Sequence, residues 1–314
     1  MDKIYIVGGG ASGMMAAIQA KTKDNEIILL EKNDRVGKKI LATGNGKCNL
    51  GNENLSVDCY YSKNSSFVEQ VLKRYDTESV VSFFASIGLK VRSKNGYLYP
   101  YAEQASVVLD VLRMELERRS IQVKPGVQIT DCTPLINKRG YLLKTPDGRS
   151  YEADRVILAC GGPASLKEGG KDGYNILQKL GLKTYPLVPG LVQLRTDGKE
   201  QKALSGVRCK ASLRLFADGI QQGSEQGELQ LTDYGISGIP VFQLSRVAAY
   251  ALRNRKSVMV QIDFTPEYSY DEIVTYLLEQ QNLRKDQTVD ELLTGFLNKK
   301  INLVFLKKCQ IAGN

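Results

Sequence analysis

The residues with the clearest chemical use lie near the N-terminus, where positions 8–13 read Gly-Gly-Gly-Ala-Ser-Gly and match the pattern G-x-G-x-x-G. The first glycine of this pattern allows a tight turn, the second lets the backbone approach a pyrophosphate, and the third lets a helix pack closely on a sheet. The N–H groups at the start of that helix attract phosphate. The motif predicts a dinucleotide site that includes Gly8, Gly10, Ala11, Ser12 and Gly13.

Glu31 is the next residue with an expected role at this site. It follows a predicted strand over 26–30, where a carboxylate would bind the hydroxyl groups of an adenosine ribose and repel a 2′-phosphate. Glu31 therefore favours FAD or NAD over NADP. A tight glycine turn without a ligand is the alternative, but the predicted strand, helix and acidic residue around the motif favour dinucleotide binding.

The stretch over 33–62 is long, irregular and rich in Gly and Asn. Loops of this length are usually functional or disordered. This one could wrap an extended cofactor, with Lys38, Lys39 and Lys47 available to neutralise phosphate, or it could be a flexible surface loop. The spacing alone leaves both interpretations open.

Composition excludes several other chemistries. The chain of 314 residues has no histidine, which excludes a Ser-His-Asp triad, a Cys-His dyad and His-ligated metal sites. None of the six cysteines belongs to a C-x-x-C pair, so we expect no zinc knuckle, no dithiol redox centre and no bound metal. Acid–base work is left to Asp, Glu, Lys, Tyr, Cys or a cofactor.

The net charge of +9 fits an anionic cofactor, a nucleic acid or simple solubility. The densest basic group, over 296–314, is interpreted as a solvated helix face, so we expect no nucleic-acid partner. The N-terminus lacks the core of a signal peptide, and no apolar run approaches the ~18 residues of a membrane helix. With scattered cysteines that suit reduced thiols, these features favour a cytoplasmic protein without a membrane partner.

The elements that must position the motif indicate an α/β chain. A strand over 4–7 leads into the glycines, a helix over 12–21 follows, and a strand over 155–158 runs into Gly161 and Gly162 in the same way. Between them we predict helices over 65–75, 76–88 and 104–119, a hairpin at Asn95-Gly96, and antiparallel strands over 127–133, 141–145 and 150–153. Further along we predict a helix over 172–181, strands over 185–263 with a helix at 241–252, and helices over 270–306.

From Glu31 onward the sequence resembles a known family. The run over 31–49, EKNDRVGKKILATGNGKCN, resembles the signature of bacterial FAD flavoproteins known as NAD(P)/FAD-dependent oxidoreductases, which include aminoacetone-oxidase-like and bile-acid-reductase-like proteins. The similarity continues at 96–106, 158–162, 172–174, 189–192 and 227–238. It spans essentially the whole chain, and the block over 43–49 is highly specific.

The resemblance implies an α/β fold with a Rossmann-like FAD-binding domain over 1–188, an inserted β-rich domain over 189–264 and a small helical region over 265–314. It also implies a glycine-rich segment after Asn314 that completes the FAD-binding domain, so we expect this chain to lack that segment. The cofactor-binding residues that it implies are Gly8, Gly10, Ala11, Ser12, Gly13, Glu31, Lys32, Gly37, Lys38, Thr43, Gly44, Asn45, Cys48, Asn49, Val127, Ala159, Gly161 and Gly162.

The resemblance implies an FAD-dependent oxidoreductase that transfers a hydride between the flavin and a small organic substrate, with NAD(P)H or oxygen as the other redox partner. It singles out no catalytic residue. Two alternatives stay open: a non-catalytic nucleotide-binding scaffold, suggested by the implied missing segment, and a flavin-dependent RNA-modifying enzyme, suggested by the charge. Cys48 could be a thiol beside the flavin, although loop packing is favoured. Tyr174 and Tyr234 could line a substrate cavity or simply pack.

Overall fold

A computed structural model describes residues 1–164 and 172–311 of the chain. The chain divides into two compact units, Met1–Tyr185 and Pro186–Asn314. The three-part division expected at 188 and 264 stays a prediction. Within the described ranges, no helix combines the length and the hydropathy needed to cross a membrane.

The first unit is built on a four-stranded parallel sheet. Its strand order is β10-β1-β2-β6. Along β1, Ile4 and Ile6 enter the core on one face, whereas Tyr5 and Val7 enter the core on the other. Both faces are therefore apolar, as expected for a parallel sheet buried between two layers. The strands are β1 (Asp2–Val7), β2 (Asn25–Glu31), β6 (Gln122–Pro125) and β10 (Arg155–Leu158).

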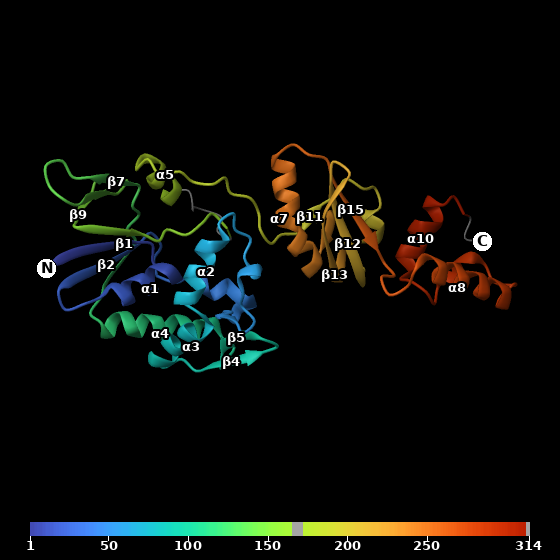
Figure 1. The fold of residues 1–314 in the computed structure, drawn as a ribbon, viewed down its shortest axis with the longest axis horizontal. Helices are drawn as coiled ribbons and strands as arrows, with labels where there is room; N and C mark the ends of the chain where they lie inside the picture. Colours follow the sequence, from blue (N-terminus) through green and yellow to red (C-terminus); the bar gives the residue numbers. More distant parts are fainter. Residues whose placement is uncertain (165–171, 312–314) are drawn as a thin grey trace. The chain divides into compact units, whose positions relative to one another are not determined.

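Helices cover one face of this sheet and an antiparallel sheet covers the other (Figure 1). On the first face lie α1 (Ala11–Ala20) and α4 (Ala105–Arg118). On the second lie β7 (Asp131–Pro134), β8 (Tyr141–Lys144) and β9 (Ser150–Ala153), with α5 (Asp172–Lys179) tied to β7 by the Lys179–Asp131 ion pair at 2.8 Å. This layering fixes the ends of the parallel strands, where the glycine motif lies.

The rest of the first unit is a smaller layer of helices and hairpin. It contains η1 (Ile40–Gly46) and η2 (Val57–Cys59), which are 3₁₀ helices, α2 (Ser65–Arg74), α3 (Thr77–Ser86), and the strands β3 (Gly51–Asn52), β4 (Val91–Lys94) and β5 (Tyr97–Pro100). The helix predicted over 76–88 is α3, and Asp76 caps it by accepting a hydrogen bond from the backbone N–H of Ser79. The predicted hairpin is also confirmed: Asn95 and Gly96 both have positive φ, which suits a two-residue turn.

The second unit is an antiparallel sheet with helices. Its strand order is β11-β14-β13-β12-β15, and α7 buries Val241, Leu244 and Ala248 in the same core as strand residues Leu213 and Leu229. The strands are β11 (Leu194–Arg195), β12 (Arg208–Ala217), β13 (Ile220–Thr232), β14 (Gly235–Ser237) and β15 (Val258–Asp263). The helices are α6 (Gln201–Leu204), α7 (Ile239–Arg253), α8 (Tyr270–Leu283), α9 (Val289–Leu293) and α10 (Lys299–Lys308).

The predicted α/β class is confirmed, with one correction in the first unit. The strand predicted over 127–133 begins only at Asp131, and the strand β6 (Gln122–Pro125) was missed. β6 is short and contains Gln, Lys and Pro, so its composition lacks the apolar run of a buried strand. It lies at the edge of the sheet, where such residues are tolerated.

A buried carboxylate links the two helices that cover the sheet. Glu115 on α4 is 4% exposed and accepts hydrogen bonds from Arg118 Nε at 2.6 Å and Arg119 Nε at 2.5 Å. Arg119 Nη1 in turn donates to the Ile18 carbonyl oxygen of α1 at 2.9 Å. Hydrogen bonds from Arg118 lower the pKa of Glu115 from its ordinary 4.5 to about 2. The interaction therefore helps to hold α1, and with it the glycine turn, against α4.

We expect Glu115→Gln to lower the free energy of unfolding by about 1–2 kcal/mol at pH 7, because two arginines lose a charged acceptor. A carboxyl with a lowered pKa stabilises the fold above pH 4.5 and loses that contribution as the pH falls toward 2. The difference between wild type and variant in urea unfolding should therefore shrink below pH 4.5. Glu117→Gln, at an exposed position of α4, is the control. A difference independent of pH would contradict this account.

Candidate cofactor-binding site

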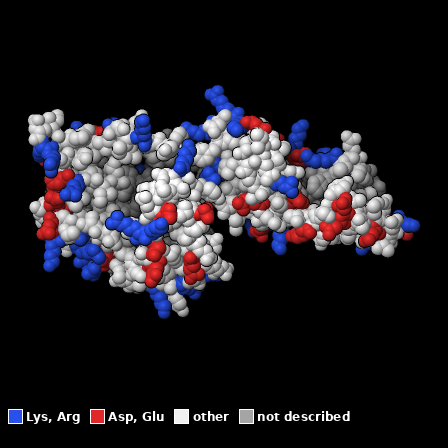
Figure 2. Space-filling view, in the orientation of Figure 1, with Lys and Arg blue, Asp and Glu red and all other residues white. Residues whose placement is uncertain are grey.

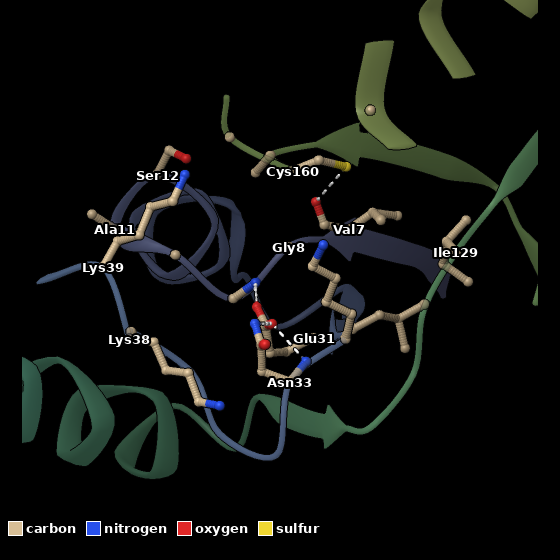
Figure 3. Close-up of a pocket in the computed structure, with 18 of the residues that line it drawn as sticks. Val7, Gly8, Ala11, Ser12, Glu31, Asn33, Lys38, Lys39, Ile129 and Cys160 are labelled. Atoms are coloured by element: carbon tan, nitrogen blue, oxygen red, sulfur yellow. Dashed lines mark hydrogen bonds between the residues drawn. The ribbon is translucent and has the colours of Figure 1, made fainter. Parts of the chain in front are cut away.

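A cavity of about 350 Å³ opens at the carboxyl ends of β1, β2 and β10 (Figure 3). This is the edge at which open α/β sheets bind ligands, at the strand where the chain order reverses. The volume falls within the ~300–1,000 Å³ of ligand pockets. The sequence-predicted residues that line it are Gly8, Gly10, Ala11, Ser12, Glu31, Lys32, Gly37, Lys38, Thr43, Val127, Ala159, Gly161 and Gly162.

The glycines of the motif have different physical roles. Gly8 has φ +111°, and a Cβ there would lie 2.4 Å from the Ala159 carbonyl oxygen. A Cβ on Gly13 would lie 1.8 Å from the Gly8 carbonyl oxygen, so Gly13 allows α1 to pack on the turn, although it does not line the cavity. A Cβ on Gly10 would meet no protein atom within 4 Å. The space beside Gly10 is therefore open to a ligand.

The first turn of α1 faces this space. Gly10 is the residue that precedes the helix, and no side chain caps the helix N-terminus. The N–H groups of the first turn have no partners within the helix, so they can bind an anion. With the empty Cβ position of Gly10, this arrangement fits the pyrophosphate of a dinucleotide.

Glu31 is buried at the end of β2, with 7% of its surface exposed. Its Oε2 accepts a hydrogen bond from the Gly9 N–H at 2.7 Å, and its Oε1 accepts from the Asn33 N–H at 2.8 Å and from Asn33 Nδ2. A Cβ on Gly9 would lie 3.0 Å from Glu31 Oε2 and 2.6 Å from Val36 Cγ1, so only glycine fits there. The carboxylate thus faces the cavity while it also holds the glycine turn.

Three lysines near the cavity have different partners. Lys39 Nζ donates to the Gly162 carbonyl oxygen at 2.7 Å, which joins the loop after β2 to the loop after β10. Lys38 Nζ lies 2.5 Å from Asp34 Oδ1 and lowers the pKa of that carboxyl. In Figure 3 the side chains of Lys38 and Lys39 point in different directions. Lys47 pairs with Glu103 and does not line the cavity.

The specific block over 43–49 mostly lies away from the cavity. Only Thr43 lines it, whereas Gly44, Asn45, Cys48 and Asn49 do not. Gly44 and Asn45 both have φ +55°, and Cys48 has φ +58°. A Cβ on Gly44 would lie 2.6 Å from the Asn49 backbone nitrogen. The residue types of this block therefore meet demands of the backbone, and their contact with a cofactor stays a prediction.

Cys48 packs in the core of the first unit, at 8% exposure. Burial raises the pKa of its thiol, which disfavours the reactive thiolate. This supports loop packing over a reactive role. Tyr174 Oη lies near Gly162, 3.8 Å from the position of a Cβ on that glycine, whereas Tyr234 belongs to the second unit and stacks beneath Arg195. Neither tyrosine lines the cavity.

Several lining residues were not predicted from the sequence. They are Val7, Gly9, Leu30, Asn33, Ile40, Gln128, Ile129, Cys160 and Gly173, whereas Lys39 also lines the cavity and is one of the lysines expected to neutralise phosphate. Cys160 Sγ donates to the Val7 carbonyl oxygen at 3.5 Å, across the paired ends of β1 and β10. The strand that runs into Gly161 is the sequence signal that could have located Cys160, whereas Asn33 carries no comparable signal. Among the described residues, no group of three or more Cys, Asp and Glu side chains is placed to hold a metal ion.

The chain is similar to known proteins over most of its length. Residues 2–246 match the family model described as HI0933-like protein Rossmann domain, and residues 188–314 match the HI0933-like protein barrel and H2TH domain. A 3-dehydro-bile acid delta(4,6)-reductase of Clostridium scindens is 40% identical over 96% of this chain and 74% of its own length. Ribosomal RNA dihydrouridine synthases of Haemophilus influenzae and Escherichia coli are 26% and 24% identical over 94% of this chain, and over 72% and 71% of their own lengths.

Among solved structures, an open-conformation flavocytochrome c3 fumarate reductase is similar with a TM-score of 0.44 and 16% identity, over 66% of this chain and 46% of that chain.

Two variants of the motif should separate its binding and packing roles. Gly10→Ala places a methyl group in the open cavity, so we expect melting within about 2 °C of wild type but at least about tenfold weaker ADP binding. Gly13→Ala forces α1 away from the turn, so we expect a loss of about 1–3 kcal/mol of stability. Calorimetric titration and thermal unfolding measure both. Unchanged ADP affinity in Gly10→Ala would rule out this location for the phosphates.

Proposed function

The chain belongs to the HI0933-like protein family and is an FAD-dependent oxidoreductase, and we propose that it reduces a carbon–carbon double bond conjugated to a carbonyl group. This proposal is supported by the names of three relatives, which describe the same type of reaction. A delta(4,6) double-bond system in a 3-dehydro-bile acid is conjugated to a 3-oxo group. Dihydrouridine is uridine whose ring double bond, conjugated to a carbonyl, has been reduced.

The cavity residues would hold and orient FAD at its adenosine diphosphate half. Gly10 and the first turn of α1 would receive the pyrophosphate, and Glu31 would accept a hydrogen bond from a ribose hydroxyl. Lys39 lies in the cavity wall and, among the described residues, has no carboxylate partner, so its charge is available to the phosphates. When bound, FAD supplies the hydride chemistry at its flavin ring.

The substrate we propose first is a small, largely apolar enone of the 3-oxo steroid type, because the reductase relative is the more similar of the two kinds. Ribosomal RNA is the second candidate, favoured by the two synthases. Against it, basic and acidic side chains intermingle on the face shown in Figure 2, whereas RNA-binding surfaces concentrate basic residues.

We further propose that reduced nicotinamide supplies the electrons by docking transiently, because the sequence carries a single G-x-G-x-x-G motif. A cytoplasmic location is part of the same proposal. The six free cysteines support it, since disulfides are rare in that compartment.

The test begins with the visible spectrum of the purified chain and the identity of the flavin released by heat. The FAD-loaded protein is then reduced without oxygen, by NADH or NADPH, and mixed with one candidate oxidant at a time. We expect rapid reoxidation of the flavin by a 3-oxo-4,6-diene bile acid and none by its saturated 3-oxo counterpart, which is the matched control. Reoxidation by a uridine-containing ribosomal RNA fragment alone would replace the first substrate by the second. Failure of both oxidants would overturn the proposed reaction.

The two adjacent lysines provide a prediction about the phosphates. Lys39→Met should weaken FAD binding about 10–100-fold and flatten its salt dependence, because a cation is lost from the cavity wall. Lys38→Met should change the affinity by less than about threefold, because its ammonium is already paired with Asp34. Fluorescence quenching of FAD at several ionic strengths measures both. Equal effects of the two substitutions would refute the assignment to Lys39.

A further inference from the structure

We infer that Asn33 is a positioning residue, which fixes the Glu31 carboxylate so that the site accepts an adenosine ribose with free hydroxyls and rejects one with a 2′-phosphate. The inference rests on the proposed binding of FAD at this cavity, and it concerns a residue to which neither the sequence pattern nor the comparisons assign a role. Asn33 lies directly after β2 and lines the cavity beside Glu31 (Figure 3).

Asn33 donates two of the three hydrogen bonds that the Glu31 carboxylate accepts from described residues. Among the described residues, Asn33 supplies both hydrogen bonds to Glu31 Oε1, one from its backbone N–H at 2.8 Å and one from Nδ2. Glu31 Oε2 accepts a hydrogen bond from the Gly9 N–H at 2.7 Å. The plane of the carboxylate is therefore set from two sides, by the glycine turn on one oxygen and by Asn33 on the other.

Asn33 also connects this carboxylate to the segment after β6, the strand that pairs with β2. Its carbonyl oxygen accepts a hydrogen bond from the Gly126 N–H at 2.9 Å, and the Glu31 carbonyl oxygen accepts one from the Val127 N–H at 2.9 Å. Val127 begins the segment 127–129 that lines the cavity. Asn33 therefore joins the Glu31 carboxylate, which itself holds the glycine turn, to the segment after β6.

The number of acceptor sites on the Glu31 carboxylate explains how the site distinguishes a free ribose from one with a 2′-phosphate. An ionised carboxylate has about four lone-pair directions, and three N–H groups occupy three of them here. One direction is left for a hydroxyl donor. A ribose hydroxyl satisfies it, whereas a 2′-phosphate offers no proton and brings a like charge into a buried site. This discrimination needs the carboxylate to stay in place, and without the Asn33 amide Oε1 keeps only one of its two donors.

The experiment compares the affinities of the chain for ADP and for ADP carrying a 2′-phosphate, by calorimetric titration. We expect wild type to prefer ADP by about 100-fold or more, and Asn33→Leu, a substitution of similar size without a donor, to prefer it by less than about tenfold. Ser12→Ala is the matched control, because it removes a polar group from the phosphate end of the same cavity. It should shift both affinities together and leave their ratio within about twofold of wild type.

A double-mutant cycle distinguishes positioning from a general structural effect. If Asn33 acts through Glu31, Glu31→Gln with Asn33→Leu should show the same selectivity ratio as Glu31→Gln alone, within about twofold. Should Asn33→Leu not fold, Asn33→Ala serves in its place with the same expected loss of selectivity. An unchanged ratio in the folded variant, or an equal further loss in the Glu31→Gln background, would overturn the inference. Wild type that binds neither ADP nor FAD would instead count against the proposed function.

Discussion

The constraint on which the site depends is the close approach of three pieces of backbone at the carboxyl ends of β1 and β10. Gly13 brings α1 onto the Gly8 carbonyl oxygen, and Gly8 lies against the Ala159 carbonyl group, with no room for a Cβ at either glycine. This contact sets where α1 begins and therefore where its free N–H groups point. The cavity exists because glycines, which have no side chain, meet at this point. The absence of a Cβ on Gly10 leaves space for a ligand.

A buried parallel sheet is what makes so close an approach stable. The side chains of β1 alternate between two apolar cores, one under the helices and one under the antiparallel sheet, so the strand cannot shift by one residue without exchanging those cores. At the same edge, the Glu31 carboxylate at the end of β2 accepts a hydrogen bond from the Gly9 N–H. The shape of the glycine turn is thus specified by packing below it and by one carboxylate beside it.

Cavity residues could be predicted from the sequence where they belong to a local motif. They could not be predicted where their place depends on tertiary contacts. The glycine motif, Glu31 and the second strand that runs into Gly161 have fixed spacings, so their places at the cavity could be predicted. Gln128 and Ile129 reach the cavity after the edge strand β6, whose polar sequence gives no strand signal. Asn33 lies in the loop after β2, and its role depends on hydrogen bonds that spacing does not show. The block over 43–49 shows the opposite case: its residue types are distinctive because four of its residues have positive φ, although most of it lies off the cavity.

The relatives also indicate where substrate selection does not reside. Proteins named for a bile acid and for ribosomal RNA match this chain over 94–96% of its length. On the proposed assignment, the cavity residues hold the adenosine diphosphate half of the cofactor, so they would not choose between substrates so different in size and charge. The same proposal places the choice of substrate with residues outside the cavity wall. One cofactor site would then be compatible with divergent substrates, because the proposed reaction, hydride transfer to a double bond conjugated to a carbonyl, makes the same demand on a flavin in each case.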